Sequence, residues 1–311
     1  MPFLLKIKRK NSNKLAGNQK MTKTFKQYEV LKWASLFLEK HHREPRVAEI
    51  LLQHHLGVDR SQFFAMMRDP VSEHQLDKFE TDLLEHANLG VPVQHLTGYE
   101  FFYDRQFNVN EHVLIPRPET EELVQQVIHY VREHRAVQKP LTIVDVGTGS
   151  GIIAITLALE LPDAKVYGLD ISEAALNVAA KNADTHRAEV EFLQGDFLTP
   201  FISKKKQADI IVSNPPYISK EEAPELSDTV INFDPGVALF AEDEGLAAYK
   251  KITAQLPKCL AKEKAALFYE IGHTQGPEVK AIIQHSFPDS QPAIIQDINQ
   301  KDRIIFSQLP S

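Results

Sequence analysis

Short apolar runs alternate with stretches of helical periodicity through the second half of the chain. Runs such as residues 143–146 and 210–213 have the length and the β-branched content of buried strands. Strands that alternate with helices form a mostly parallel sheet with helices on both faces, because each parallel crossover carries a helix. The pattern therefore predicts an α/β fold, with an antiparallel pair at its end. The predicted strands are 141–146, 166–170, 190–193, 210–213, 265–271, 293–298 and 303–308, and the predicted helices are 152–161, 173–183, 246–260 and 277–286.

The chain before this alternation has two other patterns. From residue 25 to about residue 89, apolar residues recur at helical spacing, and turn-forming residues divide them into about four short helices. Between residues 98 and 114, aromatic residues alternate as in a β-hairpin. A length of 311 residues suits two domains. We therefore expect an extension at residues 1–20, a helical domain at 21–90, a hairpin linker at 91–118 and the α/β domain at 119–311.

Charge is distributed unevenly along the chain. The formal charge is −7, and residues 1–20 contribute six Lys or Arg and no acid, which leaves −13 on residues 21–311. An acidic body disfavours nucleic acid as a partner, because binding without sequence preference depends on Lys and Arg at the phosphates. The basic segment ends just before Met21, where the helical pattern begins. We expect a disordered extension translated from an upstream start, with an RNA-binding arm or a targeting peptide as the alternatives.

The apolar runs and the cysteine content exclude further classes of protein. The apolar runs are much shorter than the roughly 18 residues of a membrane span, and the N-terminus lacks a signal-peptide core. The single Cys259 cannot form an internal disulfide, and the Cys and His residues do not have zinc-ligand spacing. We therefore expect a cytoplasmic protein without a membrane partner or a structural metal.

A glycine-rich turn follows the first predicted strand of the sheet. The carboxyl end of a parallel strand is where open α/β sheets bind ligands, and glycine lets a ligand approach the main chain. Ile152 stands where a dinucleotide fingerprint requires glycine, and the Lys-Ser or Lys-Thr of a phosphate loop is absent. The alternative is a tight strand–helix turn without a ligand. The turn consists of Gly147, Thr148, Gly149, Ser150 and Gly151.

Acids lie at the ends of three successive predicted strands. Asp145 precedes the glycine turn, and Asp170 ends the second strand, where its carboxylate can accept hydrogen bonds from both hydroxyls of a ribose. After the third strand, Asp196 can accept from an adenine amino group while Phe197 packs against the ring. Each acid alone is typical of a helix cap or a solvated loop. Three of them at one edge of the sheet favour a single adenosine ligand.

The fourth predicted strand brings an Asn-Pro-Pro-Tyr segment to the same edge of the sheet. A primary amide nitrogen is a poor nucleophile because its lone pair is delocalised, so its methylation needs acceptors that hold both N–H groups. The Asn214 side-chain oxygen and the Pro215 carbonyl can accept them, and Tyr217, which follows Pro216, can stack over the planar group. Hydrogen bonds that strengthen as the nitrogen gains positive charge favour the transition state. The segment predicts methyl transfer from S-adenosylmethionine to an amide or amino nitrogen; a plain Asn-Pro-Pro turn is the alternative.

From about Met21 to Leu309, the chain resembles the peptide chain release factor glutamine N5-methyltransferases of bacteria. The Asn-Pro-Pro-Tyr segment carries this resemblance together with other segments of the chain. The resemblance implies a class I S-adenosylmethionine-dependent methyltransferase domain. Its fold is Rossmann-like, with a mostly parallel seven-stranded sheet and an antiparallel last strand. It also implies a small N-terminal helical bundle that helps grip the substrate, which is the glutamine of the Gly-Gly-Gln loop of class I release factors. The segments that carry it are Pro92-Val93-Gln94-His95-Leu96-Thr97-Gly98, Ile115-Pro116-Arg117-Pro118-Glu119-Thr120-Glu121, residues 145–151 and Ser213-Asn214-Pro215-Pro216-Tyr217-Ile218.

The same resemblance implies roles for individual residues. Residues 147–151 and Asp170 are expected to bind S-adenosylmethionine, and Phe197 stands at a cofactor-contact position where family members vary. Residues 214–217 are expected to hold the substrate glutamine, with Asn214 close to both ligands. We also expect Arg117 and Glu119 to lie in a loop after the hairpin, where they either help to close the active site or form a structural ion pair.

Two other functions share part of the pattern. An adenine-N6 nucleic-acid methyltransferase shares the fold, the cofactor and the Asn-Pro-Pro-Tyr box, but it needs a basic cleft or a target-recognition domain, and residues 21–311 are acidic. A non-catalytic S-adenosylmethionine-binding or assembly protein is the second alternative, which the intact box disfavours.

Overall fold

The computed structural model describes residues 24–134, 140–261 and 265–310, so the predicted extension at residues 1–20 lies outside the described residues. Contacts within the chain divide it into two compact units, one up to Leu89 and one from Gly90 onward. Each unit buries its own set of apolar side chains.

The described residues of the first unit form a helical bundle with one pair of two-residue strands. The apolar residues at helical spacing face inward, and Val30, Leu38, Leu51 and Leu83 are almost completely buried. Gly57 ends the second of these helices in the left-handed conformation that glycine adopts without strain. The helices are present as predicted. The two short strands were not predicted, because two residues are too few to show an apolar period. The elements are β1 (Phe25–Lys26), α2 (Gln27–Lys40), α3 (Arg46–Leu56), α4 (Arg60–Ala65), β2 (Pro70–Val71) and α5 (Glu73–Leu89).

The described residues of the second unit form a sheet of seven strands in the order β10-β11-β9-β8-β5-β6-β7. Strands β5 to β9 run parallel, and β11 is antiparallel to both of its neighbours. The chain moves outward from β5 through β6 to β7 and then returns to β8 on the other side of β5, which creates a switch point at the carboxyl ends of these strands. The predicted class I methyltransferase fold is confirmed. The strands are β5 (Thr142–Val146), β6 (Lys165–Asp170), β7 (Val190–Gln194), β8 (Ile210–Ser213), β9 (Ala265–Glu270), β10 (Ala293–Gln296) and β11 (Asp302–Leu309).

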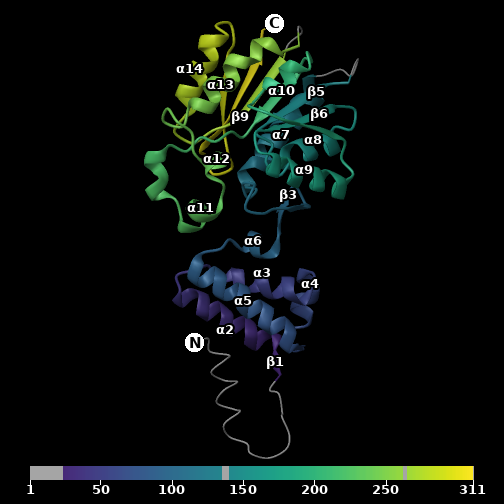
Figure 1. The fold of residues 1–311 in the computed structure, drawn as a ribbon, viewed down its shortest axis with the longest axis vertical. Coiled ribbons are helices and arrows are strands. Elements are labelled where there is room, and N and C mark those ends of the chain that lie inside the picture. Colours follow the sequence, from purple (N-terminus) through teal and green to yellow (C-terminus); the bar gives the residue numbers. More distant parts are fainter. Residues whose placement is uncertain (1–23, 135–139, 262–264, 311) are drawn as a thin grey trace, which may run out of the picture. The chain divides into compact units, whose positions relative to one another are not determined.

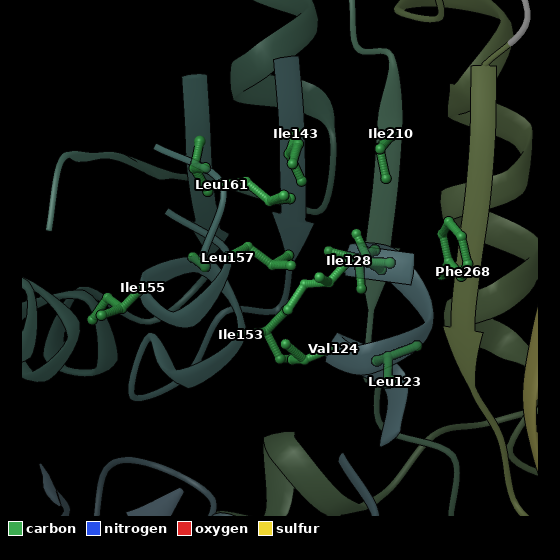
Figure 2. Packing of buried hydrophobic residues seen from close by; sticks show 14 of the residues in the cluster. Leu123, Val124, Ile128, Ile143, Ile153, Ile155, Leu157, Leu161, Ile210 and Phe268 are labelled. Atoms are coloured by element: carbon green, nitrogen blue, oxygen red, sulfur yellow. The ribbon is translucent and has the colours of Figure 1, made fainter. Parts of the chain in front are cut away.

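Helices cover both faces of this sheet (Figure 1). Successive strand residues alternate between the faces, so that Ile143 joins one core cluster and Val144 joins the other. Each fully buried aliphatic side chain in these clusters stabilises the fold by about 1.5–3 kcal/mol. On one face lie α7 (Pro118–His134), α8 (Ile152–Glu160) and α9 (Glu173–His186), and on the other lie α10 (Thr199–Ser203), α13 (Ala247–Gln255) and α14 (Gly276–Ser286). Figure 2 shows the first face, where Leu123, Val124 and Ile128 of α7 and Ile153 and Leu157 of α8 gather beside Ile143, Ile210 and Phe268 of the strands.

A β-hairpin precedes the sheet and packs into the core of the same unit. After α6 (Val93–Thr97), strands β3 (Tyr99–Phe102) and β4 (Arg105–Asn108) pair antiparallel, as the alternating aromatic residues predict. Phe102 and Phe107 are buried in the cluster that also contains α7 and α8.

The expected loop position of Glu119 is wrong. Helix α7 begins at Pro118, so Glu119 lies in its first turn while Arg117 precedes it. Proline suits the first helical position because its missing N–H has no acceptor there, and an acid in the first turn interacts favourably with the helix dipole. These start signals are present in the sequence.

The segment between β8 and α13 contains short elements for which the sequence carries no clear period. They are η1 (Lys220–Glu225), α11 (Asp228–Phe233) and α12 (Gly236–Leu239), and the short η2 (Leu256–Lys258) follows α13. Among residues 24–134, 140–261 and 265–310, no helix combines the length and the apolarity that crossing a membrane requires.

Candidate active site

A cavity of about 350 Å3 lies in the second unit at the carboxyl ends of β5, β6, β7 and β8. Its size is typical of a small-molecule site. Its wall also includes residues 112–117, 237, 238, 240 and 241, together with residues of α7, α8, α9 and α13. The predicted site residues that line it are Gly147, Thr148, Gly149, Ser150, Asp170, Asp196, Phe197, Asn214 and Pro216, whereas Gly151, Pro215 and Tyr217 are not part of the lining.

The glycine turn presents its main chain to the cavity. Gly147 and Gly149 have φ angles of 75° and 54°, and a Cβ on either residue would meet no heavy atom within 4 Å. Space therefore remains beside the backbone for a ligand. Gly151 has a different task, because a Cβ there would lie 2.8 Å from the Ile155 side chain at the start of α8. Its lack of a side chain allows helix packing.

The Asp170 carboxylate is fixed by main-chain donors. Its Oδ2 accepts a hydrogen bond from the N–H of Gly149 (2.9 Å), and its Oδ1 accepts from the N–H of Ser172 (2.9 Å). A carboxylate has about four acceptor positions, so each oxygen retains capacity for a further donor. The arrangement suits a carboxylate that accepts from two ligand hydroxyls.

Asp145 differs from the other two strand-end acids because it is buried and does not line the cavity. Its Oδ2 accepts a hydrogen bond from the Thr148 hydroxyl (2.6 Å), which fixes the turn from beneath. Burial raises the pKa of Asp145 to about 7, although the hydrogen bond from Thr148 opposes this rise. The interpretation of three acids around one adenosine therefore holds at most for Asp170 and Asp196.

Asp196 and Phe197 line the cavity together with Lys251 of α13. The Lys251 Nζ lies 2.6 Å from Asp196 Oδ2 and 5.5 Å from the centre of the Phe197 ring. Both charged side chains are about half exposed, so the ion pair contributes little to stability. The carboxylate expected to accept from adenine thus already has a cationic neighbour.

The Asn214 side chain is attached to a buried polar chain. Its Nδ2 donates to the Thr120 hydroxyl (3.2 Å), and that hydroxyl donates to Glu270 Oε2 (2.7 Å). Thr120 and Glu270 are 1% and 2% exposed. Burial raises the pKa of Glu270 to about 7, while the hydrogen bond from Thr120 and the charge of Arg303 oppose the rise.

Tyr217 is held through its main chain, and its side chain packs against the second core cluster. Its carbonyl accepts a hydrogen bond from Gln275 Nε2 (2.8 Å), and a Cβ on Gly245 would overlap the same carbonyl oxygen. Burial, together with the charge of Glu270, raises the pKa of the Tyr217 phenol to about 12. The phenol therefore remains neutral at physiological pH.

Two family models match the chain. The PrmC N-terminal domain matches residues 29–98, and the methyltransferase small domain matches residues 131–233. A release factor glutamine methyltransferase of Bacillus subtilis is 46% identical over 278 residues, which are 89% of this chain and 96% of that protein. Proteins of the same name from Bacillus cereus and Staphylococcus aureus are 43% and 42% identical, over 91% and 79% of this chain and 99% and 86% of their own lengths. The chain belongs to the release factor glutamine methyltransferases.

Three cavity or network residues of this family member were not identified from its sequence. Thr120 lies in the Pro-Arg-Pro-Glu-Thr-Glu segment but carried no predicted role. Glu270 lies next to the end of a predicted strand and ends the observed β9, which is a signal similar to the one that identified Asp170. Lys251 lies within a helix and carries no local signal of its own.

Arg117 both lines the cavity and forms an ion pair. Its guanidinium lies 3.0 Å from Asp234 Oδ2, in the segment between α11 and α12, and the Asp234 carboxylate is 2% exposed. Burial raises the pKa of Asp234, whereas the charge of Arg117 lowers it. The structure thus shows the ion pair at a residue of the cavity wall, and a role of Arg117 in closing the active site stays a prediction.

Proposed function

We propose that the chain transfers a methyl group from S-adenosylmethionine to the side-chain amide nitrogen (N5) of the glutamine in the Gly-Gly-Gln motif of class I peptide chain release factors. The observation that carries this proposal is the shared lining of one cavity. The glycine turn and Asp170 meet Asn214 and Pro216 there, so a methyl donor and a planar acceptor can bind side by side.

The residues present fit S-adenosylmethionine. The open backbone at Gly147 and Gly149 and the free acceptor capacity of Asp170 suit an amino-acid moiety and a ribose, and Phe197 offers an apolar surface for a purine. We assign these residues, with Thr148, Ser150 and Asp196, to the cofactor. When bound, the cofactor supplies an electrophilic methyl group on a sulfonium.

The other side of the cavity is assigned to the glutamine amide. We assign the Asn214 side-chain oxygen and the Pro215 carbonyl to the two N–H groups, and Pro216 and Tyr217 to the plane of the amide. Asn214 and Pro216 line the cavity, and Pro215 and Tyr217 adjoin them in the sequence without lining it. These acceptors bind more strongly as the nitrogen gains positive charge, so they stabilise the transition state more than the ground state. The nitrogen would exchange one N–H for N–CH3 as the S–CH3 bond of the sulfonium breaks and leaves a neutral thioether, S-adenosylhomocysteine, and the displaced proton would leave to water.

The proposed partner is a protein. We also propose that the chain itself is cytoplasmic and does not bind nucleic acid stably. The formal charge of −13 on residues 21–311 supports this, because a phosphate-binding surface needs excess Lys and Arg. Salt-sensitive binding of the protein to duplex DNA in a filter or anisotropy assay would contradict it.

The decisive assay combines labelled S-adenosylmethionine with purified class I release factor and with its Gln→Ala loop variant, followed by mass spectrometry of the loop peptide. A methyl group on the Gly-Gly-Gln glutamine that is absent from the variant supports the proposal. Absence of transfer, despite calorimetric cofactor binding, would reject the release factor as substrate. Labelling of an adenine-containing oligonucleotide instead would favour an adenine-N6 methyltransferase.

A further inference from the structure

The polar chain behind Asn214 joins three distant parts of the sequence. Thr120 comes from the first turn of α7, Asn214 follows β8 and Glu270 ends β9. The distances are 3.2 Å from Asn214 Nδ2 to Thr120 Oγ1 and 2.7 Å from Thr120 Oγ1 to Glu270 Oε2. Thr120 is also part of the cavity wall, next to Asn214. This polar chain is thus almost completely shielded from water, and it ends at the Asn214 side-chain amide, which is assigned to substrate binding.

The direction of these hydrogen bonds follows from the donors available. An ionised carboxylate only accepts, so the single proton of the Thr120 hydroxyl goes to Glu270. The hydroxyl then has only lone pairs for Asn214, which must face it with its NH2 group. The opposite amide orientation would place two acceptors against each other. A buried carboxylate at one end of the chain thereby selects one of the two orientations of the amide at the other end.

We propose that Thr120 and Glu270 are positioning residues that hold the Asn214 amide with its NH2 group toward Thr120, leaving its oxygen for an N–H of the substrate amide. This inference rests on the proposed function. A flipped Asn214 would present a donor to a substrate N–H group, so it would repel the amide it has to orient. Neither positioning residue has to touch the substrate.

The protonation state of Glu270 gives this device a pH dependence. The charged or titratable groups that act on Glu270 come from four other segments: Glu119 of α7, Tyr217 after β8, Tyr249 of α13 and Arg303 of β11. Burial raises the pKa of Glu270 to about 7 against the opposing charge of Arg303. A protonated Glu270 can donate to Thr120, which frees the Thr120 proton for the Asn214 oxygen and permits the flipped amide. Turnover should therefore fall as the pH drops below about 7.

The first test replaces Thr120 with Val, which keeps the side-chain shape and removes the hydroxyl. Thr156→Val is the matched control, because Thr156 is a fully buried threonine of α8 outside the cavity lining. We expect kcat on release factor to fall about 10- to 100-fold in Thr120→Val, the size expected for a misplaced reacting group. The KM for release factor and the Kd for S-adenosylmethionine should change less than threefold. Thr120→Ser should retain kcat within about threefold, since it restores the hydroxyl.

The outcomes separate positioning from mere packing. An unchanged kcat in Thr120→Val, an equal loss in Thr156→Val, or a loss of cofactor affinity as large as the loss of kcat would each overturn the inference. All effects are measured relative to wild-type turnover. Absence of wild-type turnover on release factor would therefore reject the proposed function, which is a different result.

A second test does not depend on Thr120→Val folding. In Glu270→Gln the side chain stays neutral, so kcat should be about tenfold below wild type at pH 8 and nearly constant between pH 6 and 8. Wild-type kcat should rise over the same range at saturating substrates. A rise of wild-type size in Glu270→Gln, or a flat wild-type profile, would contradict the role of Glu270.

Discussion

The two halves of the cavity are held in place by different kinds of contact. In the cofactor half, formed by residues 147–150 and Asp170, the hydrogen bonds to Asp145 and Asp170 join residues at most 21 positions apart, and both bonds to Asp170 come from main-chain N–H groups. The longest-range contact of this half, from Asn182 Nδ2 to the Ser150 carbonyl, spans 32 positions. In the amide half, formed by Asn214, Pro216 and Thr120, side chains from positions 94 and 150 residues apart fix one another. The first half is therefore built by a local turn, whereas the second exists only once the whole sheet has formed.

This difference predicts separate kinetic effects for the two halves. Changes in the cofactor half should alter the affinity for S-adenosylmethionine, because they alter the surface on which it binds. Changes in the amide half should alter turnover, because those acceptors act on the nitrogen as its charge develops.

The largest effect is expected for Asn214→Ala. Loss of one acceptor directed at developing charge typically lowers kcat about 10²- to 10³-fold, or roughly 3–4 kcal/mol. The Kd for S-adenosylmethionine, measured by calorimetry, should change less than about fivefold. Asn177→Ala, at an exposed position of α9, is the matched control. Turnover near the wild-type rate would remove Asn214 from the chemistry, and a parallel loss of cofactor affinity would erase the distinction between the halves.

Each half also buries one carboxyl group beneath it, Asp145 under the glycine turn and Glu270 behind Asn214. Burial raises the pKa of Asp145 from 3.8 to about 7. The folded state therefore holds this proton more tightly than the unfolded state, and stability falls as the pH rises from about 4 to 7. Between pH 5 and 8 this amounts to roughly 2–3 kcal/mol.

The test of this pH dependence compares the wild type with Asp145→Asn, which stays neutral and has nearly the same shape. The melting temperature of the wild type should fall by roughly 4–12 °C more than that of the variant between pH 5 and 8. Scanning calorimetry at both pH values measures the difference. Parallel shifts in the two proteins would show that Asp145 does not bind a proton in this range.

The sequence predicted most of the residues that line the cofactor half of the cavity, because their signals are local. A glycine turn after an apolar run, and an acid at the end of the next strand, stand within 26 residues of each other, from Asp145 to Asp170. The predicted strand boundaries lie within two residues of the observed ones, since the apolar periods are clear, whereas the helix predicted at 246–260 ends at Gln255 and α7 was not predicted as a helix. The predicted fold and methyl-transfer chemistry thus needed only short segments.

The contacts that hold the amide half in place could not be predicted from the sequence in the same way. Thr120 and Glu270 are 150 residues apart, and they meet because α7 packs on the sheet while β9 lies beside β8. Strand order of this kind is not encoded in any local period. Glu270 did carry a usable signal, as an acid at a strand end, and Pro118 with its following acids marked the start of α7.

Within the cofactor half, Asp170→Ala should weaken S-adenosylmethionine binding by about 1.5–3 kcal/mol, the loss expected for hydrogen bonds to a charged group. Asp170 also holds the N–H groups of Gly149 and Ser172, so its removal loosens the turn as well. Asp163→Ala, at an exposed position, is the matched control. Calorimetric affinity equal to that of the wild type would place the ribose elsewhere, while kcat at saturating cofactor should stay within about threefold.

Asp196→Ala should have the smallest effect, less than about 1 kcal/mol on cofactor affinity. Its carboxylate is about half exposed and already paired with Lys251, so water and the lysine compete with any adenine amino group for the same oxygens. Removal of the acid also frees Lys251, which can then stay over Phe197 and compensate in part for the lost contact. Titration calorimetry of Asp196→Ala beside Asp170→Ala, at low and high salt, measures the difference. A loss in Asp196→Ala as large as in Asp170→Ala would mean that cofactor binding displaces Lys251 and uses this carboxylate fully.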